Sequence, residues 1–312
     1  MNGLIKWLLR TAAILFGVGA LLALGGWALG GQTRMEVNVA GQDISVGIGG
    51  FRFSRSSMVE YGESQSANDV SAFNEVDIDI SLGDVYFVPS DSYGVSLAWS
   101  NEHYTLNYTN EGGKLKIWSS KVANISFPFG NDTRATVTVN YPIDIQFSKV
   151  NIDTALGIVD LSGFSADSLD LTASLGDVRV AGVSMEKGTM ELSLGNLWLE
   201  EIKADKLDIS LSMGELEGYG LTTAKKLTIE NHMGKTAVQG AFAGETEITS
   251  NMGDVTVTTS LPRGDYGYEL YASMGKIRVD GATVDGEAVR RGGPHNIMVD
   301  NSMGKVTLEF DS

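Results

Sequence analysis

Three histidines and three pairs of nearby acidic residues are the side chains of this sequence best suited to metal binding or acid–base chemistry. His103, His232 and His295 are not accompanied by cysteines or carboxylates at the regular spacing that a zinc site needs. His232 stands two residues before a recurrent glycine, where equivalent segments mostly have Ser or Asn, so we interpret it as structural. The sequence predicts no metal site and no cofactor.

Paired carboxylates can also hydrolyse glycosidic bonds, and polysaccharide-degrading enzymes can carry them on one face of a β-helix. The candidate pairs are Asp77/Asp79, Glu200/Glu201 and Asp205/Asp208. Outward-facing strand positions are expected to carry acidic residues in any case. No G-x-S-x-G motif, P-loop or dinucleotide-binding fingerprint occurs. We predict that the chain has no catalytic residues and is not an enzyme.

Aromatic residues gather in two stretches and could bind sugars if their rings are exposed. They are Trp99, Tyr104, Tyr108 and Trp118 in the first stretch and Tyr266, Tyr268 and Tyr271 in the second. We expect most of them to pack internally, Tyr268 in particular. A glycan-binding platform stays open as an alternative.

The charge balance limits the kinds of partner that the protein can bind. With 23 basic and 39 acidic residues, the net charge is −16. Binding to nucleic acid requires a basic face that displaces counterions from phosphates, so we predict no nucleic-acid partner.

Residues 11–30 contain no charged side chain and predict a transmembrane helix. Trp7 and Trp27 are twenty residues apart, about 30 Å along a helix, which places an aromatic residue at each membrane interface. Lys6 and Arg10 precede the segment and place the N-terminus in the cytoplasm.

The alternative is a cleaved signal peptide, since small residues at 28–30 could form a cleavage site. The apolar run is longer than a typical signal core, which favours a retained anchor. On this interpretation residues 1–34 are a cytoplasmic tip and a transmembrane helix. The protein would be a single-pass protein of the cell membrane with an extracytoplasmic C-terminal domain.

A Leu-Gly or Met-Gly pair recurs nine times and dominates the remaining sequence. From Gly157 onward the glycines are spaced by 19, 19, 19, 20, 19, 22 and 29 residues. The nine predicted corner glycines are Gly83, Gly157, Gly176, Gly195, Gly214, Gly234, Gly253, Gly275 and Gly304.

Apolar residues alternate with polar ones on both sides of these glycines, which indicates two half-buried strands joined at a corner. Seven and five residues before the glycine stand pairs such as Val76/Ile78, Leu169/Leu171 and Ile297/Val299. Two and four residues after it stand pairs such as Val85/Phe87, Val178/Val180 and Val306/Leu308. One such unit cannot bury its apolar row alone, so we predict an all-β parallel β-helix, or β-solenoid, of about nine coils. Ladders of Leu, Met, Ile and Val should fill its interior.

Each glycine is explained by a corner with positive φ or by a neighbouring backbone too close for a Cβ atom. The residue after it should form a surface row of partly alternating charge, which would keep the coils in register. This row comprises Asp84, Ile158, Asp177, Asn196, Glu215, Lys235, Asp254, Lys276 and Lys305. A calcium ladder is the alternative, although one carboxylate per coil provides few ligands.

The period is interrupted between Gly83 and Gly157, where residues 94–145 predict an antiparallel insertion that caps the first coil. Residues 35–70 are expected to be a linker or N-terminal cap, and residues 71–312 the solenoid. The segments 261–267 and 281–294 should be loops that project from the last coils.

The segments VDIDISLGDVYFVPSD, VNIDTALGIVDLSGF, LDLTASLGDVRVAGV and NSMGKVTLEF resemble the bacterial putative-adhesin family of membrane-anchored β-solenoids, a domain of unknown function. The resemblance covers roughly residues 70–312. It implies the solenoid fold and an envelope location, and it provides no catalytic motif.

Together these features predict a non-enzymatic, adhesin-like interaction or structural module of the cell envelope. Its partners would be the membrane, through the N-terminal helix, and an envelope protein or cell-wall glycan. The alternatives are a carbohydrate-binding or carbohydrate-processing surface protein and an envelope scaffold that self-assembles through its coil ends. The oligomeric state is left open by the sequence.

Overall fold

The computed structural model describes residues 34–39, 42–47, 50–55, 63–68, 70–100, 104–120 and 135–311. The predicted membrane segment, residues 11–30, lies outside these ranges. Among the described residues, no helix has both the length and the apolar character needed to cross a bilayer. Near the N-terminus, β1 (Arg34–Val39), β2 (Gln42–Gly47) and β3 (Gly50–Arg55) form an antiparallel three-stranded sheet.

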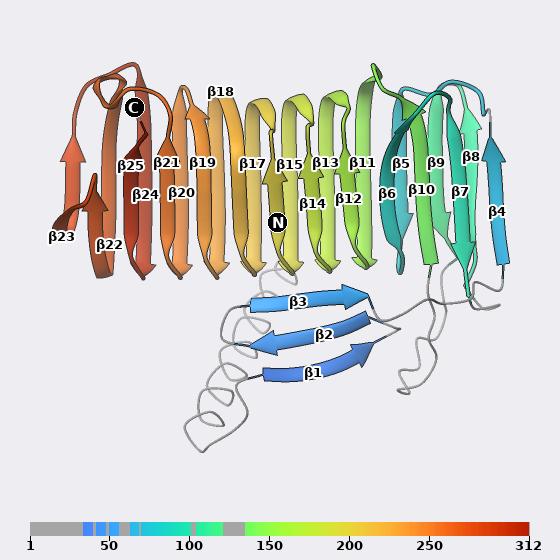
Figure 1. The fold of residues 1–312 in the computed structure, drawn as a ribbon, viewed down its shortest axis with the longest axis horizontal. Coiled ribbons are helices and arrows are strands. Elements are labelled where there is room, and N and C mark those ends of the chain that lie inside the picture. Colours follow the sequence, from blue (N-terminus) through green and yellow to red (C-terminus); the bar gives the residue numbers. More distant parts are fainter. Residues whose placement is uncertain are drawn as a thin grey trace, which may run out of the picture.

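Most of the chain is a solenoid in which a long strand, a glycine corner and a short strand repeat (Figure 1). The long strands are β11 (Gln146–Leu156), β13 (Ser165–Leu175), β15 (Ser184–Leu194), β17 (Lys203–Met213), β20 (Glu245–Met252) and β24 (His295–Met303). The short strands are β12 (Val159–Ser162), β14 (Val178–Ala181), β16 (Leu197–Glu200), β19 (Thr236–Phe242), β21 (Val255–Thr259) and β25 (Val306–Phe310). β18 (Leu216–Met233) and β22 (Tyr266–Val279) each contribute to both faces.

Long strands pair in parallel with long strands, and short strands with short strands. The register places equivalent residues opposite each other, for example Leu169 opposite Val150 and Val178 opposite Val159. The alternating apolar positions predicted on both sides of the glycines are buried in the core, so the all-β parallel solenoid is confirmed.

The prediction that the Leu and Met residues of the Leu-Gly and Met-Gly pairs fill the interior is wrong. The Leu or Met that precedes each corner glycine is only half-buried or is exposed. This residue lies at the corner itself, where the two faces meet, so alternation along the strand no longer directs it fully into the core.

A second corner links each short strand to the next long strand. Gly163, Gly182 and Gly220 adopt left-handed backbone there, with φ between +61° and +69°. Glu201 occupies the equivalent position with φ +53°. Since side chains disfavour this conformation, Glu201 is a point of local strain in the repeat.

The N-terminal end combines parallel and antiparallel strands. β5 (Glu75–Ile80) and β6 (Asp84–Ser90) form the coil that contains Gly83, and β9 (Lys114–Ser119) and β10 (Ala135–Pro142) pair with them in parallel. β4 (Glu63–Asn68), β7 (Gly94–Trp99) and β8 (Leu106–Glu111) run antiparallel to their neighbours. The expectation that residues 94–145 are wholly antiparallel is therefore corrected, because β9 and β10 form a further parallel coil.

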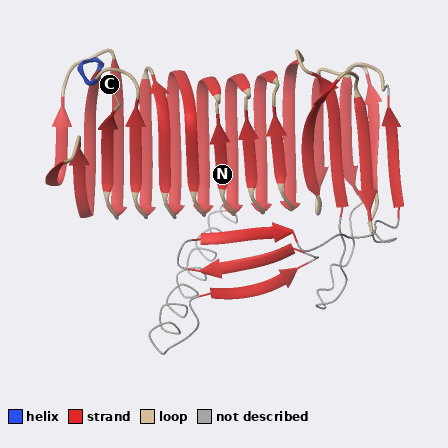
Figure 2. Ribbon diagram, in the orientation of Figure 1, coloured by secondary structure: helices blue, strands red, loops and turns tan. Residues whose placement is uncertain are grey.

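The C-terminal end does not follow sequence order. β24 lies between β20 and β22. The last segment of the chain is therefore inserted between two coils that precede it in the sequence. β23 (Ala282–Arg290) pairs antiparallel with β22 and covers the end of the stack. The predicted loop at 281–294 is thus largely a strand, and a short 3₁₀ helix (Arg263–Asp265) lies within 261–267 (Figure 2).

Candidate binding surface

The nine corner glycines lie in one column along the solenoid. Eight of them have φ between +135° and +153°, and Gly275 does not. From Gly157 onward, a Cβ atom would lie only 1.7–2.0 Å from the carbonyl oxygen of the glycine in the adjacent coil. Each close approach is fixed by a backbone hydrogen bond, such as that from Gly214 N to Met233 O at 2.9 Å. Both reasons predicted for glycine therefore apply to most of the column.

The row after the glycines differs from the predicted surface row. Asp84, Asp177 and Asn196 are buried, whereas the lysines of the C-terminal half are exposed. Asp177 Oδ1 accepts hydrogen bonds from the backbone N–H of Asn196 at 2.9 Å and from its side-chain amide at 3.0 Å. Asp254 Oδ1 accepts one from Lys305 N at 2.8 Å. These acidic side chains therefore act as acceptors for backbone N–H groups of the next coil.

One member of each acidic pair named as a candidate is engaged in an ion pair between coils. Asp77 lies 3.2 Å from Lys114 Nζ. Glu200 pairs with Arg179 at 2.9 Å, and Asp205 pairs with Lys225 at 2.6 Å. Outward alternation along the strands accounts for all three.

The two described histidines also bridge coils. His232 is exposed and its Nδ1 lies 2.9 Å from Asn251 Nδ2. His295 is the first residue of β24, rather than part of a loop, and its Nδ1 accepts a hydrogen bond from Gly244 N at 3.0 Å. His103 lies outside the described residues. Within the described ranges, no cluster of three or more His, Cys, Asp or Glu could hold a metal ion.

Most of the aromatic candidates pack internally, as predicted. Trp99, Tyr104, Tyr266 and Tyr268 are buried. Trp118 and Tyr108 are half-buried, and Tyr271 is exposed. The first stretch combines a partly exposed ring, that of Trp118, with a cavity.

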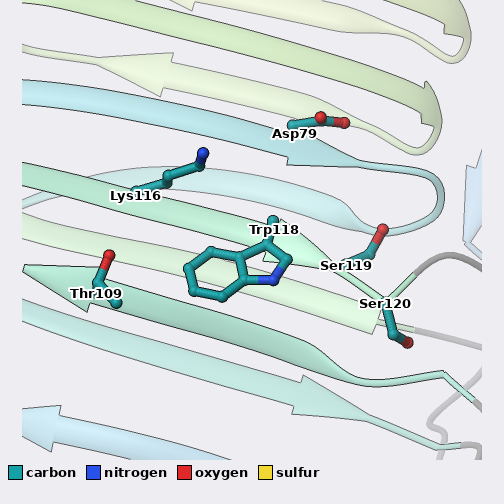
Figure 3. Close-up of a pocket in the computed structure, with 6 residues that line it drawn as sticks. All are labelled: Asp79, Thr109, Lys116, Trp118, Ser119 and Ser120. Carbon is teal, nitrogen blue, oxygen red and sulfur yellow. The ribbon is translucent and has the colours of Figure 1, made fainter.

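That cavity is a shallow groove of about 470 Å³ on the long-strand face near the N-terminal end (Figure 3). Trp118 lies between Thr109 on one side and Lys116 and Asp79 on the other. The strand register explains this arrangement, since Trp118 pairs with Asp79 of β5 and Lys116 pairs with Thr109 of β8. The groove lining, named here the Trp118 groove, comprises Asp79, Thr109, Lys116, Trp118, Ser119 and Ser120.

The end of the groove is held by hydrogen bonds. Ser119 Oγ accepts one from Ser81 N at 3.0 Å, and Ser120 Oγ accepts one from Thr105 N at 3.0 Å. An aromatic face beside a carboxylate, an ammonium and hydroxyl groups can combine apolar contact with directional hydrogen bonds. This is the arrangement that a polar, hydroxyl-rich ligand requires.

Two carboxyl groups next to the groove have pKa values that are shifted in opposite directions. Burial raises the pKa of Asp77, but hydrogen bonds from Asn151 and Lys114 outweigh it and hold that pKa below its ordinary value. Burial and the nearby negative charge of Asp79 raise the pKa of Asp153. Asp153 pairs with Asp79 across β5 and β11, so two carboxylates lie side by side on the acidic side of the groove.

Two exposed aromatic residues were missed by the sequence reasoning. Trp198 and Tyr219 lie on the short-strand face, where their side chains are 36% and 53% exposed. Both occupy outward positions after a corner glycine, so the alternation contained the signal needed to find them.

In the described part of the chain, the fold and these surfaces define an all-β parallel solenoid that carries a shallow groove at Trp118. A sequence profile of the Toastrack DUF4097 family matches residues 101–286, which is more than half of the 312 residues. The chain belongs to this family. The family resemblance inferred from the repeat is confirmed.

Solved structures of low sequence identity are similar to this chain, and the first of them shows the same fold. A putative adhesin from Bacteroides fragilis is 10% identical, with 79% of this chain and 97% of that chain covered and a TM-score of 0.50. A putative adhesin from Parabacteroides distasonis is 17% identical, covering 80% and 97%, with a TM-score of 0.41. A putative lipid binding protein from Parabacteroides distasonis is 14% identical, covering 78% and 97%, with a TM-score of 0.41. No curated protein matches the chain.

Proposed function

We propose that this protein is a non-enzymatic, adhesin-like module of the cell envelope, held at the membrane by an N-terminal helix and displaying a rigid solenoid outside. The observation that supports it best is the continuous stack of hydrogen-bonded coils. Such a stack presents regular rows of side chains over a long surface, which suits binding to an extended partner. In each acidic pair that could have supported catalysis, one carboxylate is engaged in an ion pair between coils.

The orientation can be tested by cysteine labelling, because the natural chain contains no cysteine. Glu191 is exposed on the long-strand face, so Glu191→Cys should react with a membrane-impermeant maleimide in intact spheroplasts. Asn2→Cys should react only after lysis. Labelling of Asn2→Cys in intact spheroplasts, or protection of Glu191→Cys, would overturn the proposed topology.

The Trp118 groove supports a second candidate, binding of cell-wall carbohydrate. Its half-buried indole could stack against a sugar ring while Asp79, Lys116 and Thr109 meet the hydroxyl groups. The groove is open and shallow, so affinity for one short oligosaccharide should be modest. Several sugar units of one polymer would be needed for firm retention.

Co-sedimentation of the detergent-solubilised full chain with purified cell-wall sacculi tests this candidate. Trp118→Ala should reduce retention about tenfold, which corresponds to about 1.4 kcal/mol. Trp198→Ala removes an exposed tryptophan from the other face and should leave retention unchanged. Equal retention by both variants would exclude the groove as the carbohydrate site.

A further inference from the structure

The Leu or Met before each corner glycine forms an apolar row along the corner edge, named here the Leu/Met ridge. In spatial order the ridge contains Leu82, Leu156, Leu175, Leu194, Met213, Met233, Met252, Met303 and Met274. At about 4.8 Å per coil it is about 38 Å long. None of the nine is fully buried, and Met252 and Met274 are 42% and 65% exposed. A contiguous apolar row of this length indicates an interaction surface.

One flank of the ridge carries no acidic or basic side chain apart from a single histidine, although the protein has a net charge of −16. These residues stand two positions before the glycines, and most are exposed. In spatial order they are Ser81, Ala155, Ser174, Ser193, Ser212, His232, Asn251, Ser302 and Ser273.

The other flank is the row after the glycines, and its charges are segregated along the solenoid. In spatial order it reads Asp84, Ile158, Asp177, Asn196, Glu215, Lys235, Asp254, Lys305 and Lys276. Acidic residues lie toward the N-terminal end and lysines toward the C-terminal end. When the row is reversed and offset by one coil, Glu215 lies opposite Lys235 and no two like charges face each other.

We propose that the Leu/Met ridge is the surface through which two copies of this chain associate side by side in antiparallel orientation. In a two-fold dimer whose axis crosses the ridge, each flanking row faces the same row of the partner in the opposite direction. With the axis between the coils of Gly214 and Gly234, Glu215 faces Lys235 of the partner subunit, and the pair occurs twice. Farther out, Lys276 of the partner subunit faces Ile158, and Lys305 of the partner subunit faces Asp177, which is buried and hydrogen-bonded to Asn196, so the outer coils contribute no like-charge contact.

Charge disfavours the two neighbouring registers. A shift of one coil in one direction places Glu215 opposite its own copy, and a shift in the other direction places Lys235 opposite its own copy. Both shifts create like-charge contacts, which are unfavourable at an interface. A parallel arrangement would instead place the charged row against the serine-rich flank, where no charge complements it.

The size of the contact sets its strength. A ridge about 38 Å long with one flanking row on each side covers about 600 Å² per copy, which is below the typical 800 Å² of a stable complex. We therefore expect a reversible dimer. It does not depend on the membrane anchor or on the Trp118 groove.

Disulfide cross-linking of the Cys-free full chain tests the arrangement. Ala155 and Ser273 are exposed on the uncharged flank and face each other across the proposed dimer. In one chain they are seven coils apart, about 34 Å, so neither an internal bond nor a bond between identical variants can form. Differently tagged Ala155→Cys and Ser273→Cys chains should cross-link only when mixed.

Charge reversal at the axis tests the register. Glu215→Lys should weaken cross-linking about tenfold, and adding Lys235→Glu should restore it, because the double variant recreates the pair with opposite signs. Unchanged melting temperatures would show that folding is intact. Lys187→Cys, which is exposed on β15 seven residues before the ridge residue Leu194, should not cross-link in any mixture.

Several outcomes would overturn the proposal. Cross-linking of Ala155→Cys with itself would contradict the proposed antiparallel register, and absence of cross-linking in the mixture would indicate another occupant of the ridge. Loss of association that the double variant fails to restore would refute the register.

Discussion

Gly214→Ala separates the two reasons for glycine at the corners. The added Cβ would lie 1.7 Å from Gly195 O, whereas real contacts of this kind do not fall below 3.0 Å. The coils must therefore move apart by more than 1 Å at this point, which weakens the hydrogen bonds that join them, from Gly195 N to Met213 O and from Leu197 N to Glu215 O. The backbone also has φ +152°, which disfavours any side chain.

The expected loss follows from these contributions. Two weakened hydrogen bonds amount to about 2 kcal/mol, and positive-φ strain adds about 1–2 kcal/mol. Gly214→Ala should therefore destabilise the solenoid by about 3–4 kcal/mol, or lower its melting temperature by about 10 °C.

Two matched variants isolate the contributions. Gly182 has φ +61°, but a Cβ there would meet nothing closer than 3.8 Å, so Gly182→Ala should cost about 1–2 kcal/mol from strain alone. Gly275 has no positive φ, but its Cβ would lie 1.9 Å from Gly304 O, so Gly275→Ala tests close approach alone. Thermal and urea unfolding followed by circular dichroism should rank Gly214→Ala as the most damaging. If Gly182→Ala were equally damaging, close packing of the coils would not be the reason for the column.

Other predictions concern single side chains. Glu201→Gly should stabilise the protein by about 0.5–1 kcal/mol in urea unfolding, because it relieves φ +53°, and a lower midpoint would contradict this. Asp177→Ala should destabilise by about 1–3 kcal/mol, since it leaves buried N–H groups without an acceptor, whereas Asp254→Ala at the exposed end of the row should cost less. Asp77→Asn should lower the melting temperature at neutral pH, because a lowered pKa means that the ionised form stabilises the fold, and the deficit should vanish on acidification through that pKa. Asp153→Asn should raise the melting temperature at neutral pH, because its raised pKa marks an ionised form that destabilises the fold, and the gain should also vanish in acid. Identical pH profiles for the two variants would refute both assignments.

The Trp118 groove shows how far a candidate site can be derived from sequence. Trp118 was recognisable as an aromatic residue in a strand-like segment, and Asp79 as an outward-facing carboxylate. Their proximity was not recognisable, because it depends on β9 pairing with β5 although 39 residues separate Asp79 from Trp118 in the chain. Nothing in local periodicity specifies which distant strand becomes the neighbour.

The Leu/Met ridge illustrates the opposite error. The alternation assigned these residues to the interior. They lie at the corner, where the chain changes direction, so their side chains do not point fully into the core. Strand periodicity predicts side-chain direction only while the strand continues.

The sequence by itself determined the repeating unit: two strands, a glycine corner and the residues that face the core, because period-2 alternation and a glycine-only backbone are local properties. The tertiary structure alone decided the order of the coils at both ends. Parallel pairing accepts any coil of matching shape, so the position of β24 between β20 and β22 follows from the hairpin with β23, which turns the chain back before its last segment pairs. The order of charges in the row after the glycines follows from this insertion as well. Lys276 comes before Lys305 in the chain, but Lys305 comes before Lys276 along the solenoid.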